Sequence, residues 1–229
     1  MDLTIMETST LSRLTSTRLL RPRRHRARVV LWPAHRLIYV RVPKSGNTSI
    51  ARAIPDGEKT RICPRSLVHE YADWTLFSFV RNPYARLVST YCQKIAAEPV
   101  THGSMVHGVH RGFLERGLPM FAGMSFEEFA EVACGHDDSA TEKHLKSQVY
   151  HLCRKGRRYP DYVGRLENMG RDWARLAASL GLNQALPHLN RSRHRHWREF
   201  YRDPALRQRV ADRYGNDFEK FGYDPARWV

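Results

Sequence analysis

The prediction of the fold starts from the stretch WTLFSFVRNPYARLVSTYCQK at residues 74–94. Its first seven residues are nearly continuously apolar, which is typical of a strand that is buried on both faces of a parallel sheet. Arg81 and Asn82 then turn the chain, and Pro83 suits the first position of a helix. We expect this helix to run to about Ala97, so the stretch predicts a strand, a turn and a helix in succession.

A second unit of the same kind lies earlier in the chain. The segment RLIYVRV at 36–42 alternates partly and is rich in β-branched and aromatic residues, so it predicts another strand. The polar turn PKSGNTS follows at 43–49, and Thr48 or Ser49 can cap a short helix that continues through Ile54. The N-terminal half of the chain therefore holds two strand–turn–helix units.

The rest of the sequence adds further elements to this pattern. A third strand is predicted at 161–167, before an amphipathic helix at about 169–180, and an apolar stripe near the C terminus predicts a helix packed on the core. Strands that alternate with helices indicate an α/β fold, a P-loop-like three-layer sandwich in which helices flank a central parallel sheet. A chain of 229 residues suits one domain. We expect a disordered basic tail at 1–28 and one domain at 29–229.

The composition limits the class of protein. The formal net charge is +15, which favours an anionic partner such as nucleic acid, a phosphorylated cofactor, an acidic polysaccharide or a membrane surface. The four cysteines form no CxxC pair, which argues against a zinc ribbon or a disulfide scaffold and suits a reducing cytoplasm. No apolar run approaches the roughly 18 residues that cross a bilayer, and the N-terminal stretch lacks the apolar region of a secretory signal. We expect a cytoplasmic protein.

The turn at 43–49 has the chemistry of an anion site. A turn with a glycine between a strand and a helix points backbone N–H groups into one concavity. Lys44 supplies a full charge, and Thr48 and Ser49 supply hydroxyl donors. The spacing differs from the GxxxxGK[ST] loop of nucleotide triphosphatases, because Lys44 precedes the only glycine. By itself, the segment also fits a capped helix with a chance lysine.

Arg81 and Ser89 are candidates for a second anion contact. Arg81 lies at the carboxyl end of a predicted strand, where open α/β sheets bind their ligands. Ser89 is about two turns into the following helix, on a face that could meet Arg81 at one phosphate, and a guanidinium suits bidentate phosphate binding. Alternatively, Arg81 caps a neighbouring helix and Ser89 only packs.

Together, the two units resemble the 5′-phosphosulfate loop and the 3′-phosphate motif of sulfotransferases that use 3′-phosphoadenosine-5′-phosphosulfate (PAPS). The strongest resemblance is to the carbohydrate sulfotransferases of the sulfotransferase-2 group. RVPKSGNTS at 41–49 is similar to their RVPKxGxTS, and FSFVRNPYARLVSTY at 77–91 matches their FxFVRxPxxRLVSxY at each fixed position. DYVGRLEN at 161–168 is similar to their DFVGRFEN segment. The resemblance covers about residues 36–223, weakly at 98–140.

The resemblance implies a reaction and a set of roles. Sulfuryl transfer would proceed in line from PAPS to a hydroxyl of a carbohydrate or glycoconjugate, with acidic and lipid-linked acceptors among the candidates. Lys44 would contact the 5′-phosphosulfate and stabilise the departing phosphate oxygen, and Arg81 and Ser89 would bind the 3′-phosphate. No metal is implied, because cationic side chains and oriented dipoles supply the electrostatic stabilisation. The other cofactor-binding residues would be Pro43, Ser45, Gly46, Asn47, Thr48 and Ser49.

A sugar hydroxyl is a poor nucleophile, so a general base should assist the reaction. His69 is the first candidate, because some relatives carry a histidine at a similar place upstream of the 3′-phosphate motif. His144 is the second, because relatives often have a histidine in the segment before the third strand. Glu70 and Glu167 are weaker candidates.

Other interpretations of the sequence remain open. The net charge and the basic cluster at 191–198, with Trp197, would suit a nucleic-acid-binding protein, although no known binding motif supports it and we expect no nucleic acid partner. A P-loop kinase of a small alcohol would need a Mg²⁺-binding carboxylate pattern that the sequence lacks. The histidines at 102–110 would suit a metal site only with a carboxylate or cysteine beside them, and the sequence offers no strong partner of this kind to His102, His107 or His110.

Two further expectations concern the location of the protein and its acceptor. Animal members of the sulfotransferase-2 group carry an N-terminal transmembrane helix that anchors them in the Golgi. Because no such helix is predicted here, we expect a cytoplasmic bacterial enzyme. The segment 98–140 is the least similar to the family and would shape the choice of acceptor.

Overall fold

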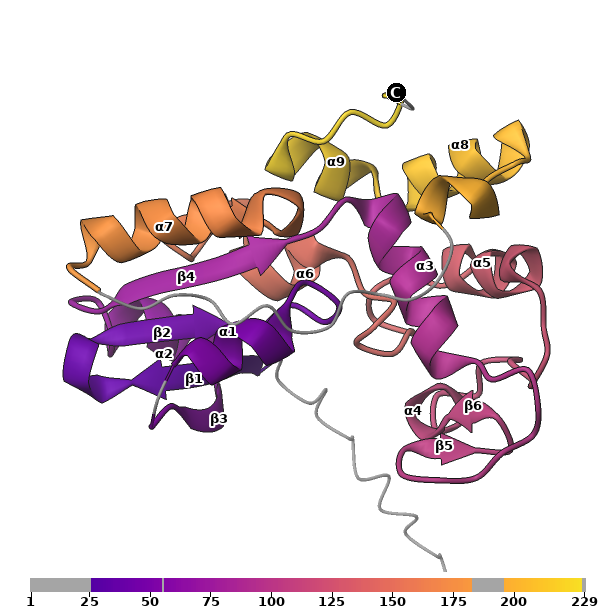
Figure 1. Cartoon of the computed structure of the whole chain (residues 1–229), viewed down its shortest axis with the longest axis horizontal. Helices are drawn as coiled ribbons and strands as arrows, with labels where there is room; N and C mark the ends of the chain where they lie inside the picture. The colour runs from indigo at the N-terminus through magenta and orange to yellow at the C-terminus, as the bar shows by residue number, and fades with distance from the viewer. Residues whose placement is uncertain (1–25, 55, 183–195, 228–229) are drawn as a thin grey trace, which may run out of the picture.

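The computed structural model describes residues 26–54, 56–182 and 196–227 (Figure 1). Most of the predicted tail at 1–28 and about half of the basic cluster at 191–198 lie outside these residues. The described chain forms an α/β fold around a five-stranded sheet with the strand order β3-β1-β2-β4-β9.

Most strands of this sheet point in the same direction. β2 (Leu37–Val40), β4 (Thr75–Val80) and β9 (Tyr162–Arg165) pair in parallel. β1 (Ala27–Trp32) runs antiparallel to both β2 and β3 (Glu58–Ile62), so four of the five strands share one direction. The predicted fold class is confirmed, and β1 and β3 extend the sheet beyond the predicted strands.

Helices cover both faces of the sheet, as a three-layer sandwich requires. On one face, Ile50 and Trp173 pack in a single apolar cluster with Tyr39 and Phe77 of the strands. On the other face, Leu67 packs in a second cluster beneath the same strands. The first face carries α1 (Asn47–Ala53) and α7 (Met169–Ser179), and the second carries α2 (Pro64–His69), α6 (Gln148–Leu152) and α9 (Gly215–Phe221).

The strand register brings the predicted motifs to one edge of the sheet. Tyr39 of β2 pairs with Phe77 of β4, and Val80 of β4 pairs with Arg165 of β9. Because parallel strands end at the same edge, the turn after β2 and the turn after β4 lie together. The candidate site is at this edge.

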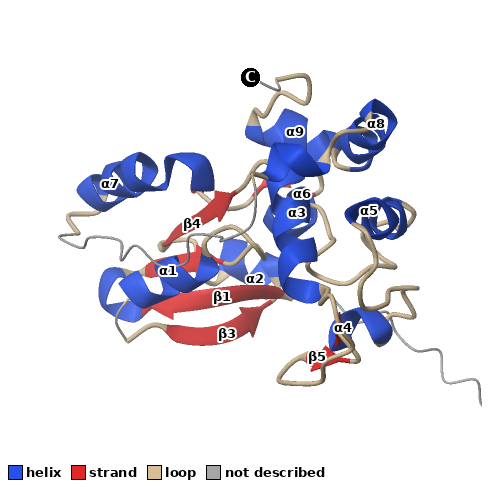
Figure 2. Ribbon diagram, turned by 45° about the vertical axis from the view of Figure 1, so that its right-hand side comes forward, coloured by secondary structure: helices blue, strands red, loops and turns tan. Residues whose placement is uncertain are grey.

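A third apolar cluster lies beside the sheet. It is built on α3 (Pro83–Lys94), α5 (Phe126–Cys134) and α8 (Pro204–Arg213), which are grouped to one side of the strands (Figure 2). Val210 and Phe218 are buried in it. The prediction that the C-terminal stripe is part of the core is therefore confirmed.

Helix α3 is shorter than predicted. It ends at Lys94 rather than near Ala97, because Ile95 has extended backbone and forms an isolated bridge with Val109. The Asn82 side chain caps the start of this helix by accepting hydrogen bonds from the first turn, and Pro83 occupies the first position as predicted. A pairing with a distant segment therefore decides where α3 ends.

The cap of helix α1 also differs from the prediction. The helix begins at Asn47 with Gly46 as its N-cap residue, so Thr48 and Ser49 lie inside the first turn and not at the cap. Gly46 has a positive φ of 81°, a backbone conformation that glycine adopts at no steric cost. The shape of the turn, and not a capping hydroxyl, sets the start of the helix.

The remaining elements are short. The stretch at 98–124 holds a small hairpin and one helical turn. Across the described chain, the short elements are the 3-10 helices Pro33–His35, Leu166–Asn168 and Trp197–Phe200, the hairpin strands β5 (Met105–Val106), β6 (Val109–His110), β7 (Cys153–Arg154) and β8 (Arg157–Arg158), and helix α4 (Arg111–Leu114).

Candidate active site

The turn after β2 contains two residues with left-handed backbone. These are Lys44 and Gly46, whose φ angles are 71° and 81°. A Cβ atom at Gly46 would lie 2.4 Å from Cε of Met169 in α7. Because Cε is the flexible end of that side chain, the positive φ is the stronger reason for glycine there. The Tyr39 hydroxyl donates a hydrogen bond to Oδ1 of Asn47 at 2.6 Å, which fixes the start of α1.

Gln148 joins this turn to Arg81. Its Oε1 accepts hydrogen bonds from the backbone N–H of Arg81 at 2.9 Å and from Oγ of Ser45 at 3.3 Å. Its Nε2 donates to the carbonyl oxygen of Arg81 at 2.8 Å. Gln148 and Ser45 are both fully buried, where such hydrogen bonds are costly to leave unmade. The two predicted anion-binding segments are therefore held together by one side chain.

Lys44 and Arg81 form a partly desolvated cationic site. Burial, together with the nearby charges of Arg81 and Lys94, lowers the pKa of Lys44 to about 7. Burial also lowers the pKa of Arg81, although Glu167 opposes this effect. A bound anion stabilises the charged form of such buried cations. The arrangement is chemically suited to an anionic group at the edge of the sheet.

Arg86 links the turn to His144. Its Nε donates to the carbonyl oxygen of Pro43 at 3.0 Å, and its Nη2 donates to the carbonyl oxygen of His144 at 3.2 Å. The side chain is almost completely buried, and burial lowers its pKa while the charge of Asp217 raises it. One guanidinium therefore sets the distance between the predicted phosphosulfate turn and the segment that carries His144.

Three other predicted cofactor-binding residues lie in α1 and α3, the helices that follow the two turns. Ser89 is buried in α3, three residues after Arg86 and thus on the same side of the helix. Thr48 is exposed and Ser49 is half-buried in α1. Their contacts with a cofactor remain predictions.

His144 forms a close pair with Glu142. Oε2 of Glu142 lies 2.7 Å from Nδ1 of His144 and accepts the backbone N–H of the same residue at 2.8 Å. Oε1 accepts from Nζ of Lys143 at 2.7 Å. Burial raises the pKa of Glu142, but the contacts with His144 and Lys143 outweigh burial and hold this pKa well below its usual range. Burial lowers the pKa of His144 to about 4 against the opposing effect of Glu142.

His110 completes a cluster with this pair. The ring centroids of His110 and His144 are 5.1 Å apart, and the side chains of His110, Glu142 and His144 offer ligand atoms within 4.8 Å of one another. The sequence did not associate a carboxylate with His110, and that expectation was wrong, since Glu142 lies beside it in the fold. Both oxygens of Glu142 already accept hydrogen bonds, so a metal ion would have to displace them. His102 and His107 are exposed and stand apart from this cluster.

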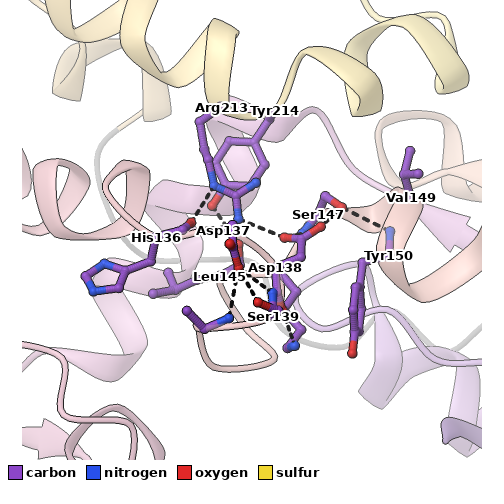
Figure 3. A network of polar contacts seen from close by, with 12 residues as sticks. His136, Asp137, Asp138, Ser139, Leu145, Ser147, Val149, Tyr150, Arg213 and Tyr214 are labelled. Carbon is purple, nitrogen blue, oxygen red and sulfur yellow. Dashed lines mark hydrogen bonds and ion pairs between the residues drawn. The ribbon is translucent and has the colours of Figure 1, made fainter. Parts of the chain in front are cut away.

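A polar network holds the segment that carries His144 and Gln148 (Figure 3). Arg213 of α8 donates from Nε to the carbonyl oxygen of His136 at 2.9 Å and from Nη2 to Oδ1 of Asp138 at 2.7 Å. Asp138 also accepts the backbone N–H of Ser147 at 2.8 Å, and the Ser147 side chain bonds its other oxygen. The Ser147 side chain then caps α6 through the N–H of Tyr150 at 3.0 Å.

Asp217 anchors the next residues of the same segment. Its two carboxylate oxygens accept the backbone N–H groups of Gln148 and Val149, both at 2.8 Å. Asp217 is fully buried, and burial raises its pKa to about 6. Helix α9 therefore holds the first turn of α6, and with it the side chain that joins Ser45 to Arg81.

His69 occupies a different environment. It is exposed at the end of α2, in the stretch that leads to the amino end of β4, whereas Arg81 follows the carboxyl end of that strand. Glu70 is also exposed. In the part of the chain that the structure describes, the polar contacts that connect a histidine to the turn at Pro43 involve His144 and not His69.

Glu167 lies next to the second motif but is already engaged. Its Oε1 accepts the backbone N–H of Asn82 at 2.7 Å, and its Oε2 accepts the hydroxyl of Tyr223 at 2.8 Å. These contacts tie the end of β9 and the C-terminal segment to the turn after β4. The geometry suits a structural role for Glu167 better than that of a base.

Comparisons with known proteins agree with this architecture. A model described as "Sulfotransferase family" matches residues 28–224, so the chain belongs to the sulfotransferase family. It is 31% identical over 177 residues to mouse carbohydrate sulfotransferase 12, a match that covers 66% of this chain and 40% of the relative. The chain thus spans less than half the length of that relative. No solved structure gives a significant match.

The described residues include no helix that is both long enough and apolar enough to span a membrane. The location of the protein in the cell and its bacterial origin stay predictions.

Proposed function

We propose that the protein transfers the sulfuryl group of PAPS in line to a hydroxyl of a carbohydrate or glycoconjugate, with His144 as the general base. The observation that carries this proposal is the side chain of Gln148, which bonds Ser45 of one motif and Arg81 of the other. Family membership supports sulfuryl transfer, and the printed name of the mouse relative supports a carbohydrate acceptor.

The two joined motifs would bind the two anionic ends of PAPS. Lys44 would contact the 5′-phosphosulfate, and the backbone from Pro43 to Ser49 would surround it. Arg81 and Ser89 would bind the 3′-phosphate, which ordinary adenine nucleotides lack. Lysine and arginine are the side chains that suit such contacts, because charge-assisted hydrogen bonds to phosphate are short and strong.

His144 is better placed than His69 to remove the proton of the acceptor hydroxyl. It is connected through Arg86 to Pro43, whereas His69 is exposed at the end of α2. With a pKa of about 4, His144 is unprotonated at neutral pH. The hydroxyl oxygen forms a bond to sulfur as its proton passes to His144. The bond between sulfur and the 5′-phosphate oxygen breaks, and Lys44 stabilises the negative charge on the departing oxygen.

A binding comparison tests the donor. Calorimetric titrations with 3′-phosphoadenosine 5′-phosphate, ATP and a random oligonucleotide separate the sulfotransferase from the kinase and the nucleic-acid-binding alternatives. We expect the bisphosphate to bind most tightly, and Arg81→Ala to weaken it by about 1.5–3 kcal/mol, the value of a hydrogen bond to a charged group. Preference for ATP would overturn the proposal.

A paired substitution tests the base. Radiolabelled PAPS with a panel of neutral and uronic-acid-containing oligosaccharides and glycolipids identifies an acceptor and gives a rate. We expect His144→Ala to lower that rate by about 100-fold or more, with near-normal binding of the bisphosphate. His69→Ala serves as the comparison. A full rate in the first variant and a large loss in the second would assign the base to His69 instead.

A further inference from the structure

We propose that Glu142 is a positioning residue that holds the ring of His144 with a proton on Nδ1 and a free lone pair on Nε2. This inference deepens the proposed function, on which the catalytic meaning of His144 rests. The protonation of the His144 ring can be measured in the protein without any sulfuryl transfer.

The contacts of Glu142 define the state of the His144 ring. Oε2 lies 2.7 Å from Nδ1 and 2.8 Å from the backbone nitrogen of the same residue. An ionised carboxylate can only accept hydrogen bonds. Nδ1 must therefore carry the proton, and in the neutral ring Nε2 is then the nitrogen that can take one from a hydroxyl.

The carboxylate of Glu142 is itself held in place. The residue is only 6% exposed, and its second oxygen accepts from Nζ of Lys143 at 2.7 Å. A Cβ atom at Gly112 would lie 3.1 Å from Cγ and 3.2 Å from Oε1 of Glu142, so the backbone of Gly112 closes against the carboxylate. The acceptor that orients His144 has little freedom to turn away.

The backbone and the ring of His144 are fixed by different residues. Arg86 holds the His144 carbonyl group and, through Pro43, the turn that carries Lys44. Glu142 holds the imidazole nitrogen. Arg86 therefore sets where the histidine stands relative to the donor turn, and Glu142 sets which ring nitrogen is free.

His110 shows the opposite arrangement in the same cluster. Its Nδ1 accepts the backbone N–H of Gly112 at 3.2 Å, so the neutral ring carries its proton on Nε2. Burial and the charge of Lys94 lower the pKa of His110, which favours the neutral form. In this form His110 can donate a hydrogen bond from Nε2 but cannot accept a proton there. Of these two rings, the one held by Glu142 is the one with a free Nε2.

Nuclear magnetic resonance of protein labelled with ¹⁵N-histidine tests the tautomer directly. Comparison with His144→Ala identifies the His144 signals, and long-range proton–nitrogen correlations report which nitrogen is protonated near pH 7. We expect Nδ1–H in the wild type and a mixture or Nε2–H in Glu142→Gln. Nε2–H in the wild type, or an unchanged Nδ1–H signal in Glu142→Gln, would overturn the inference.

Kinetics of the same variants test the consequence. We expect Glu142→Gln to lower kcat by about 100-fold without a change in the Kd of 3′-phosphoadenosine 5′-phosphate, and Glu142→Asp to retain part of the rate. Glu127→Gln, at an exposed position of α5, is the matched control and should behave as wild type. Thermal unfolding curves check that each variant is folded. If the wild type transfers no sulfuryl group, the proposed function fails, while the resonance measurement still decides the tautomer.

The pH profile separates positioning from a purely structural role. The titratable groups that face the His144 ring are Glu142, Lys143, His110 and Lys94. Loss of the carboxylate charge removes the interaction that raises the pKa of His144, so the acid limb of kcat should move to lower pH in Glu142→Gln. A reduced rate with an unmoved acid limb would contradict the proposed contact between the two residues.

Discussion

The side chain of Gln148 forms hydrogen bonds with both polar groups of the Arg81 backbone. It accepts a hydrogen bond from the N–H at 2.9 Å and donates one to the carbonyl oxygen at 2.8 Å. These two residues are 67 positions apart in the chain. The same Oε1 accepts Oγ of Ser45, so one buried amide controls the spacing between the two motifs. The relative placement of Ser45 and Arg81, and with it the spacing of the two ends of the proposed cofactor site, depends on this side chain.

Gln148→Leu should weaken cofactor binding. The substitution keeps approximately the size of the side chain but leaves the Arg81 N–H and the Ser45 hydroxyl without their acceptor, at a cost of about 1–3 kcal/mol. We expect the Kd of 3′-phosphoadenosine 5′-phosphate, measured by calorimetry, to rise by about tenfold. Gln208→Leu, at an exposed position of α8, should leave it unchanged. Equal affinities in all three proteins would show that Gln148 does not set the motif spacing.

Cofactor binding should depend on pH through Lys44. Its pKa in the unliganded protein is lowered to about 7, so above pH 7 the ammonium group loses its proton, and an anionic ligand must restore it. The affinity for 3′-phosphoadenosine 5′-phosphate should therefore fall with rising pH, approaching tenfold per unit above pH 7. Titrations near pH 8.5 in buffers of different ionisation enthalpy should detect proton uptake. Lys44→Arg remains charged and should show neither effect from this position. A flat affinity between pH 6.5 and 9 in the wild type would contradict the assignment.

Arg86→Lys should cost stability even though the charge is kept. A lysine ammonium lacks the planar fork with which Arg86 donates to the carbonyl groups of Pro43 and His144. We expect the free energy of unfolding to fall by about 2 kcal/mol, the value of a lost hydrogen bond to a charged group. Arg209→Lys, in an exposed ion pair with Glu131, should change it by less than about 0.5 kcal/mol. Denaturant titration measures both, and similar values for the two variants would be the contrary result.

Gly46→Ala and Gly170→Ala should have opposite effects. Alanine at Gly46 must adopt a φ near 81° and would approach Met169, which costs about 1–2 kcal/mol for the left-handed backbone alone. Gly170 lies inside α7, where a Cβ atom meets nothing within 4 Å, so alanine should add about 0.5–1 kcal/mol. Thermal unfolding measures both. Destabilisation of the same size at both positions would mean that the shape of the turn is not the cause.

Part of the fold could be read from local patterns. The strand before Arg81 and the helix after Pro83 were predicted because apolar runs and helix-starting residues act within a few positions of one another. Strand β3 escaped prediction because its sequence, Glu58–Ile62, is largely polar and exposed, as an edge strand can be. The end of α3 was misplaced because Ile95 pairs with Val109, which no local signal reveals.

The sequence by itself determined the family and the two motifs, since Lys44 and Arg81 stand in short, ordered patterns whose spacing is fixed by covalent neighbours. Tertiary structure alone decided what surrounds them. Gln148 and Glu142 belong to a segment without a distinctive pattern, and their roles arise because buried polar groups must find partners wherever the packed chain brings a donor against an acceptor. The preference for His144 over His69 has the same origin: it depends on which histidine the packing brings to the turn, and packing is a property of distant segments rather than of neighbouring residues.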